Sequence, residues 1–191
     1  MDKYLLLDCD ETCLDWVQGF KIFADKELGI KLVGQPDQYS MLNWMNMTDK
    51  NEVMKLVHDF NDNYEGFGSL KPIANAEIYL PKFFKEGYKI IAITASSSKE
   101  LSKKRRTDNL HDVFGNIFEE IHCVDTPEEK KKYLQKFPPS IWCEDKIWNA
   151  EMGLEFNHKC FLIRSLSSIG HEQKYPKLIW VNDWEEIYNN K

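Results

Sequence analysis

Six short apolar runs, separated by stretches with helical periodicity, constrain the fold of this chain more than any other feature. The runs predict buried strands at residues 4–7, 88–95, 121–124, 141–143, 160–163 and 178–181. Near-continuous apolar strands are typical of a sheet that is covered on both faces. Helical patterns at residues 76–86, 98–110, 127–137, 146–152 and 183–188 alternate with the runs. This alternation predicts an α/β fold with a doubly wound, mainly parallel sheet.

One long segment after the first strand interrupts the alternation. Helical patterns at residues 16–28, 39–47 and 49–64 fill it, and they carry many of the aromatic side chains of the chain. A structureless loop of about 60 residues is improbable in a compact protein. We therefore predict a small helical cap at residues 14–72, inserted into a core formed by residues 1–13 and 73–191.

The first apolar run ends in an acidic pair, within Leu5-Leu-Leu-Asp-Cys-Asp-Glu-Thr12. Side chains two positions apart on a strand share a face, so Asp8 and Asp10 can converge. Two such carboxylates repel each other unless a cation or a proton lies between them, and Mg²⁺ prefers hard oxygen ligands. The pair also suits covalent chemistry, in which one carboxylate attacks and the other transfers protons. An acidic turn that ends a strand is the simpler alternative.

Two further polar positions follow apolar runs, at the sheet edge where open α/β sheets bind ligands. Thr94 ends the second run, and its hydroxyl can bind a phosphate oxygen, although strand propensity alone also explains a threonine there. Glu144 and Asp145 follow the fourth run. They can complete a magnesium site, or Asp145 can simply cap the next helix.

A lysine near residue 130 is the last candidate. Lys130 lies three, four and seven residues before Tyr133, Leu134 and Phe137, so it shares their buried face. A lysine at the core-facing start of a helix can neutralise phosphate and carboxylate charge. Lys131 is the alternative if the register differs by one residue.

In chain order these positions form an acid pair, a hydroxyl, a lysine and a second acid pair. That order resembles the motif series of the haloacid dehalogenase superfamily, over nearly the whole chain. The resemblance implies a Rossmann-like core, a mobile cap and an aspartyl-phosphate mechanism. It implies that Asp8 attacks phosphorus, while Asp10 protonates the leaving oxygen and then activates water. The presence of Asp10 argues against a dehalogenase, which needs no leaving-group acid.

The same resemblance implies roles for the remaining positions. Thr94 and Lys130 would hold the phosphoryl oxygens. Catalysis would then rest mainly on charge stabilisation and positioning, which dominate phosphoryl transfer. Mg²⁺ is the implied cofactor, bound by the Asp8 carboxylate, the Asp10 backbone carbonyl and Asp145, with Glu144 beside them.

Further details resemble the 5'(3')-deoxyribonucleotidase branch: the cap directly after the first motif, Asp15-Trp16, the helix that contains residues 105–115, and the segment Ile179-Trp-Val-Asn-Asp-Trp-Glu-Glu-Ile187. Glu144-Asp145 departs from a double aspartate, and the Lys130 region has drifted, so the exact substrate stays open. The branch implies a nucleoside monophosphate as the small phosphorylated substrate.

Several side chains are candidate substrate contacts. Trp16, Phe20 and Trp44 can stack on a base, although Phe20 and Trp44 can equally form the core of the cap. Ser96 and Arg164 are further candidates. The basic run at residues 103–106 is interpreted as a solvated helix face, with steering of anionic substrates as the alternative.

Bulk properties limit the partners. A net charge of −6 argues against a broad footprint on duplex nucleic acid. The expectation is a cytoplasmic protein without a membrane partner, because no apolar run approaches the ~20 residues that span a bilayer and no signal-peptide pattern is present. The five cysteines lack CxxC spacing and indicate reduced thiols. Oligomer formation is left open.

Three hypotheses about function remain. The leading one is a nucleoside monophosphate phosphatase. The second is a phosphatase for another small phosphoester, such as a sugar phosphate or a nucleic-acid 3'-phosphate. The third is a non-catalytic binding protein that keeps the fold.

Overall fold

The computed structural model describes residues 2–37 and 40–191 and places one six-stranded sheet at the centre of the molecule. Its strands are β1 (Lys3–Leu7), β2 (Tyr88–Thr94), β3 (Phe118–Cys123), β4 (Ile141–Glu144), β5 (Lys159–Ile163) and β6 (Ile179–Val181). They pair in the order β3-β2-β1-β4-β5-β6, and every pairing is parallel. All six predicted strands are present, so the doubly wound α/β fold is confirmed.

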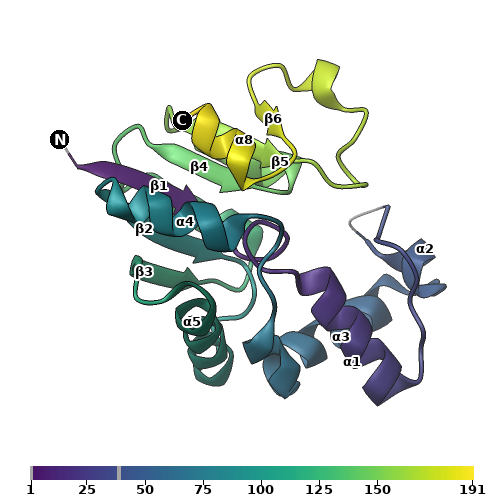
Figure 1. The fold of residues 1–191 in the computed structure, drawn as a ribbon. Helices are drawn as coiled ribbons and strands as arrows, with labels where there is room; N and C mark the ends of the chain where they lie inside the picture. The colour runs from purple at the N-terminus through teal and green to yellow at the C-terminus, as the bar shows by residue number, and fades with distance from the viewer. Residues whose placement is uncertain (1, 38–39) are drawn as a thin grey trace.

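Helices cover both faces of this sheet (Figure 1). Helices α4 (Ala76–Lys85), α5 (Glu100–Phe114) and α8 (Trp184–Asn189) pack on the face where Leu5 and Leu7 of β1 point. Helices α6 (Lys131–Leu134) and α7 (Ile147–Leu154) pack on the opposite face with Leu6. Because successive β1 side chains are buried on opposite faces, the strand is an uninterrupted apolar run in the sequence.

The helices of the core differ from the predicted ones in two places, residues 127–137 and 172–174. The predicted helix at residues 127–137 is divided into the 3₁₀ helix η2 (Pro127–Lys130) and the single turn of α6. A short 3₁₀ helix that was not predicted, η3 (Glu172–Lys174), lies between β5 and β6. Pro81 lies inside α4, as the sequence suggested, and the helix continues past it to Lys85.

The helical insertion, residues 14–72, lies beyond the carboxyl ends of the strands (Figure 1). It contains α1 (Trp16–Leu28), α2 (Leu42–Met45), α3 (Lys50–Asn63) and the 3₁₀ helix η1 (Glu65–Ser69). Helix α2 is shorter than the predicted helix at 39–47, and Tyr39 lies outside the described residues. The insertion has an aromatic core, with ring contacts among Trp16, Phe20, Phe23, Phe60, Tyr64 and Phe67.

The chain enters and leaves the insertion through two adjacent segments. The Asp15 backbone N–H donates to the Lys71 carbonyl at 2.8 Å, and the Ile73 N–H donates to the Cys13 carbonyl at 3.1 Å. These bonds tie the outgoing and returning segments together close to the predicted boundaries of the cap. No helix among the described residues is long and apolar enough to cross a membrane.

Candidate active site

The polar residues predicted from the sequence meet at one edge of the sheet, which we call the carboxyl edge. Asp8 follows β1, Thr94 ends β2 and Glu144 ends β4, and β1 lies between β2 and β4 in the sheet. The Asp8 backbone N–H donates to the Cys143 carbonyl at 3.0 Å, which continues the β1–β4 pairing. Asp8 therefore stands at the centre of the edge, with a candidate ligand on each side.

Lys130 is buried at this edge and joins two carboxylates. Its Nζ lies 3.0 Å from Asp8 Oδ1 and 2.5 Å from Glu144 Oε1, and its side chain is 1% exposed. Burial by itself lowers the pKa of Lys130, but Asp8 and Glu144 outweigh it and raise the pKa above its ordinary value. Lys131 is 43% exposed and pairs with Glu155 instead. The geometry thus selects Lys130 over its neighbour.

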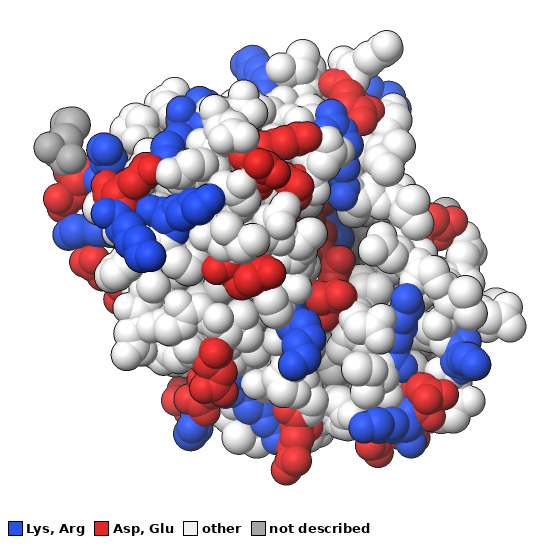
Figure 2. All heavy atoms as spheres, viewed as in Figure 1, with Lys and Arg blue, Asp and Glu red and all other residues white. Residues whose placement is uncertain are grey.

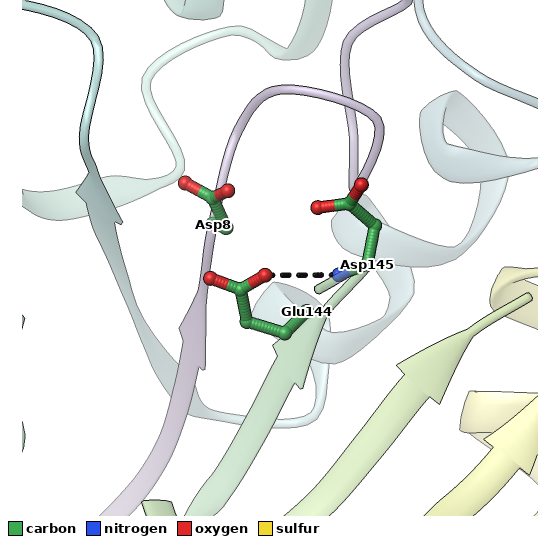
Figure 3. A group of neighbouring side chains, drawn as sticks. All are labelled: Asp8, Glu144 and Asp145. Atoms are coloured by element: carbon green, nitrogen blue, oxygen red, sulfur yellow. Dashed lines mark hydrogen bonds between the residues drawn. The ribbon is translucent and has the colours of Figure 1, made fainter. Parts of the chain in front are cut away.

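Three buried carboxylates form a candidate metal centre (Figure 3). Ligand oxygens of Asp8, Glu144 and Asp145 all lie within 4.8 Å of one another, and the Asp8 and Asp145 carboxylates are placed on either side of Glu144. Glu144 Oε2 accepts from the backbone N–H groups of Asp145 at 3.0 Å and Lys146 at 3.1 Å, while Oε1 accepts from Lys130. The Lys146 ammonium also pairs with Asp145.

Carboxyl groups outnumber basic side chains around this candidate metal centre. The described residues bring five carboxyl groups together, from Asp8, Asp10, Glu11, Glu144 and Asp145, against the three cations Lys130, Lys146 and Arg106. Burial raises the pKa of Glu144 to about 8, with Asp8 and Asp145 acting in the same direction and Lys130 opposing. When all five carboxyl groups are ionised they outnumber the cations by two; a divalent cation would balance this ionised form, and an all-oxygen donor set fits Mg²⁺.

Asp10 contacts a buried arginine that the sequence analysis placed in solvent. Arg106 of α5 is 0% exposed, and its Nη2 donates to Asp10 Oδ1. Burial raises the pKa of Asp10 to about 6; Arg106 lowers it and the Asp8 carboxylate raises it further. The solvated-face interpretation of the basic run is therefore wrong for Arg106, although it describes exposed Lys104, which pairs with Asp108.

Thr94 is fully buried at the end of β2. Its Oγ1 has no hydrogen-bond partner among the described residues. A buried hydroxyl without a partner is costly, and a bound ligand oxygen would satisfy it.

A pocket of about 160 Å³ opens over Asp8 between the core and the insertion. Figure 2 shows a hollow between these two parts in which both acidic and basic side chains are visible. From the core the pocket is lined by Asp8, Asp10, Glu11, Ala95, Pro127, Lys130, Asp145, Lys146, Asn149, Ser165 and Ser167. From the insertion it is lined by Trp16, Val17, Gln35, Pro36, Met41, Met54, Val57 and Asn61.

Trp16 is the predicted aromatic contact that reaches the pocket. Its Nε1 donates to Asn61 Oδ1 at 2.9 Å, and Asn61 Nδ2 donates to the Ser96 carbonyl at 3.0 Å. This chain of bonds fixes the indole of the insertion to the loop after β2. Asn61 was missed because a single asparagine in a helix has no pattern that marks it.

The other predicted substrate contacts lie away from the pocket lining, and Thr94 is not among the lining residues either, although its neighbour Ala95 is. Phe20 is 0% exposed within the aromatic core of the insertion, and Trp44 packs against it while its Nε1 donates to the Val33 carbonyl. Ser96 is buried and is not among the residues that line the pocket. Arg164 pairs with Glu172 and Asn182, while its neighbour Ser165 lines the pocket.

Two residues that the sequence analysis named only as parts of longer segments make contacts that support the acidic motif. Glu11 has a left-handed backbone with φ of 56°, and its Oε1 accepts from the Val17 N–H at the start of α1. Burial raises the pKa of Glu11 to about 8. Trp184 of α8 donates from Nε1 to the Thr12 carbonyl at 2.7 Å, which holds the end of the motif against the core.

No protein-family model and no curated protein matches this chain. Solved structures match it over its whole length. A haloacid dehalogenase-like hydrolase from Streptococcus pneumoniae superposes with a TM-score of 0.66 at 15% identity, covering 99% of this chain and 98% of that chain. A predicted phosphatase from Clostridium acetobutylicum has a TM-score of 0.69 at 17% identity, with 100% and 98% covered. The fold is the haloacid dehalogenase-like fold.

A third structure with the same fold was solved with a bound ligand. CbbY from Rhodobacter sphaeroides, solved with phosphate, has a TM-score of 0.63 at 13% identity, with 98% of this chain and 96% of that chain covered. Identities this low establish the haloacid dehalogenase-like fold and leave the reaction and the substrate to be argued from the site. The resemblance to the superfamily is confirmed at the level of the fold.

Proposed function

We propose that this chain is a Mg²⁺-dependent phosphomonoester hydrolase that works through an aspartyl-phosphate on Asp8. The observation that carries the proposal is the position of Asp8. It lies at the centre of the carboxyl edge, 3.0 Å from the Lys130 ammonium and within 4.8 Å of two further buried carboxylates. Asp10, two residues on, lines the same pocket.

The reaction takes place in two steps on these side chains. An Asp8 oxygen forms a bond to phosphorus as the bond from phosphorus to the leaving oxygen breaks, and Asp10 gives its proton to that oxygen. Water then attacks the phosphorus of the aspartyl-phosphate while Asp10 takes up the water proton, and Asp8 is released. Lys130 holds Asp8 and balances charge on the phosphoryl oxygens, and the Thr94 hydroxyl donates to one of them.

The metal would be held by the Asp8 carboxylate, the Asp10 backbone carbonyl and Asp145. Glu144 uses both oxygens on Lys130 and on backbone N–H groups, so we assign it to holding Lys130 and the loop that carries Asp145. A bound Mg²⁺ supplies Lewis-acid charge neutralisation of the phosphoryl group.

We infer that the substrate is a nucleoside monophosphate, as in a 5'(3')-deoxyribonucleotidase. Pocket charge supports an uncharged leaving group: the cations among the described lining residues are Lys130 and Lys146, and both already pair with carboxylates. The wall from the insertion is largely apolar, with Trp16, Val17, Met41, Met54 and Val57. Such a wall suits a base and sugar better than a second phosphate or a carboxylate.

A sugar phosphate is the second candidate. CbbY from Rhodobacter sphaeroides has also been solved with xylulose-1,5-bisphosphate, at 13% identity to this chain. That ligand carries two phosphates, and the described pocket offers no unpaired cation for the second one.

The test is a substrate panel at fixed Mg²⁺, with and without EDTA. Thymidine 5'- and 3'-monophosphates are compared with 2-phosphoglycolate, a pentose bisphosphate and p-nitrophenyl phosphate. We expect EDTA to abolish turnover, nucleotides to have the highest kcat/KM, and Asp8→Asn to lose at least ~10³-fold. Asp112→Asn, at an exposed position on α5, is the matched control. Full activity of Asp8→Asn would refute the mechanism, and a preference for bisphosphates would refute the nucleotide assignment.

A further inference from the structure

Arg106 is a buried cation directly behind Asp10. Its side chain is 0% exposed, its Nη2 donates to Asp10 Oδ1, and it is not among the residues that line the pocket. Asp10 does line the pocket. The guanidinium therefore contacts the proposed acid from outside the pocket lining.

The contacts of Arg106 do not explain, in terms of stability, why a charged side chain is buried at this position. Its Nε and Nη1 are buried without hydrogen-bond partners among the described residues. Its guanidinium carbon lies 4.2 Å from the centre of the Phe67 ring. Because a buried ion pair is often no more stabilising than apolar residues of the same size, a role in function is the better explanation for the charge.

We propose that Arg106 is a positioning residue for the leaving-group step, holding the Asp10 carboxyl in the orientation from which it transfers a proton. This inference rests on the proposed function, in which Asp10 passes its proton to the leaving oxygen as the phosphorus–oxygen bond breaks. With Oδ1 held by a guanidinium that is itself fixed on Phe67, the Asp10 side chain has one preferred orientation at the pocket. Because Phe67 belongs to the insertion, the same contact also couples Asp10 to the position of the insertion.

The test uses two substrates of almost the same shape that differ in their need for a proton. Phenyl phosphate releases a weakly acidic phenol, whereas p-nitrophenyl phosphate releases a phenol that needs little protonation. We expect Arg106→Met to lower kcat/KM, which reports the step that releases the leaving group, at least ~10-fold more on phenyl phosphate than on p-nitrophenyl phosphate, since acid catalysis contributes about 10²–10⁴-fold. Arg106→Lys should recover part of the loss on phenyl phosphate. Arg105→Met, the adjacent change that removes a bond to the Asp62 carbonyl, should affect both substrates equally.

A double-mutant cycle with Asp10→Asn completes the test. If Arg106 acts through Asp10, Arg106→Met causes no further loss of kcat/KM on phenyl phosphate in the Asp10→Asn background. Equal losses on both substrates, or additive losses in the cycle, would overturn the inference, and Arg106→Lys provides the same comparison if Arg106→Met does not fold. A wild-type protein without Mg²⁺-dependent turnover of either substrate would refute the proposed function instead.

Discussion

At the scale of single residues, one lysine holds the acidic cluster together. Lys130 contacts Asp8 and Glu144, and all three side chains are at least nine-tenths buried. Removing one member of a buried ion-pair network leaves the others without compensation, which costs far more than the network contributes relative to apolar packing. Lys130 is thus expected to matter for folding as well as for activity.

Lys130→Met tests this expectation. We expect a loss of free energy of unfolding of about 3–5 kcal/mol, because two buried carboxylates lose their cation. We also expect kcat to fall ~10²-fold or more, because Asp8 and the phosphoryl oxygens lose a charge partner. Urea unfolding and phosphatase assays measure the two effects. Lys131→Met, which removes only an exposed pair with Glu155, serves as control, and equal effects from both changes would contradict the assignment.

At the scale of elements, α5 joins the core to the insertion. Asn109 donates to the Leu70 carbonyl at 2.9 Å and accepts from the Leu70 N–H at 3.2 Å, and Arg105 donates to the Asp62 carbonyl at 3.0 Å. Asp62 also pairs with Lys99. The helix that follows β2 therefore fixes the returning end of the insertion.

Asn109→Ala should weaken this junction. The change leaves the Leu70 N–H and carbonyl buried without their side-chain partner, at about 1–3 kcal/mol for each group. Thermal and urea unfolding measure the loss. Asp112→Ala, exposed on the same helix, should stay within about 0.5 kcal/mol of the wild type. A loss no larger than that of Asp112→Ala would show that the insertion does not depend on this contact.

The same helix shows what the sequence could and could not predict. Most strands were predictable because they are apolar runs, whereas β3 (Phe-Glu-Glu-Ile-His-Cys) is largely polar and only its last three residues fall in the predicted run. Lys130 was predictable because its helical spacing to Tyr133 and Leu134 placed it on the buried face. Arg106 was missed because three basic neighbours favoured a solvated face. A pattern did exist, since the buried positions of α5 recur at helical spacing: Ser102, Arg106, Asn109, Leu110 and Phe114. Phe20 and Trp44 were uncertain for a different reason, because an aromatic side chain in a helix does not show whether it faces a core or a pocket.

At the scale of the whole molecule, the surplus of buried acid links stability to pH and to metal. Burial raises the pKa of Asp10 to about 6 and those of Glu11 and Glu144 to about 8. In the unfolded chain these acids titrate near their ordinary values of about 4. The folded protein therefore holds more protons between about pH 4 and 8, and its metal-free stability should fall as the pH rises through this window.

Melting temperatures measured with EDTA and with Mg²⁺ test how stability depends on pH and metal. The measurements are made at about pH 5.5, where the buried acids are largely protonated, and at about pH 8, where a larger share of them is ionised. Metal binds the ionised carboxylates, so Mg²⁺ should raise Tm more at the higher pH. At 100 times its Kd a ligand adds about 2.7 kcal/mol, or roughly 5–10 °C for a chain of this size. Asp145→Asn should lose the Mg²⁺ shift. A shift that is equal at both pH values, or retained in that variant, would contradict the proposed metal centre.

The most direct test of the central claim is to trap the phosphorylated Asp8. Asp10→Asn should still be phosphorylated by p-nitrophenyl phosphate, whose leaving group needs little protonation, but it should hydrolyse the intermediate slowly because its base is gone. We predict a burst of one equivalent of p-nitrophenolate and a mass gain of about 80 Da on the peptide that contains Asp8. Turnover by this variant without a burst and without phosphorylated protein would contradict the slow hydrolysis that the aspartyl-phosphate mechanism predicts for it.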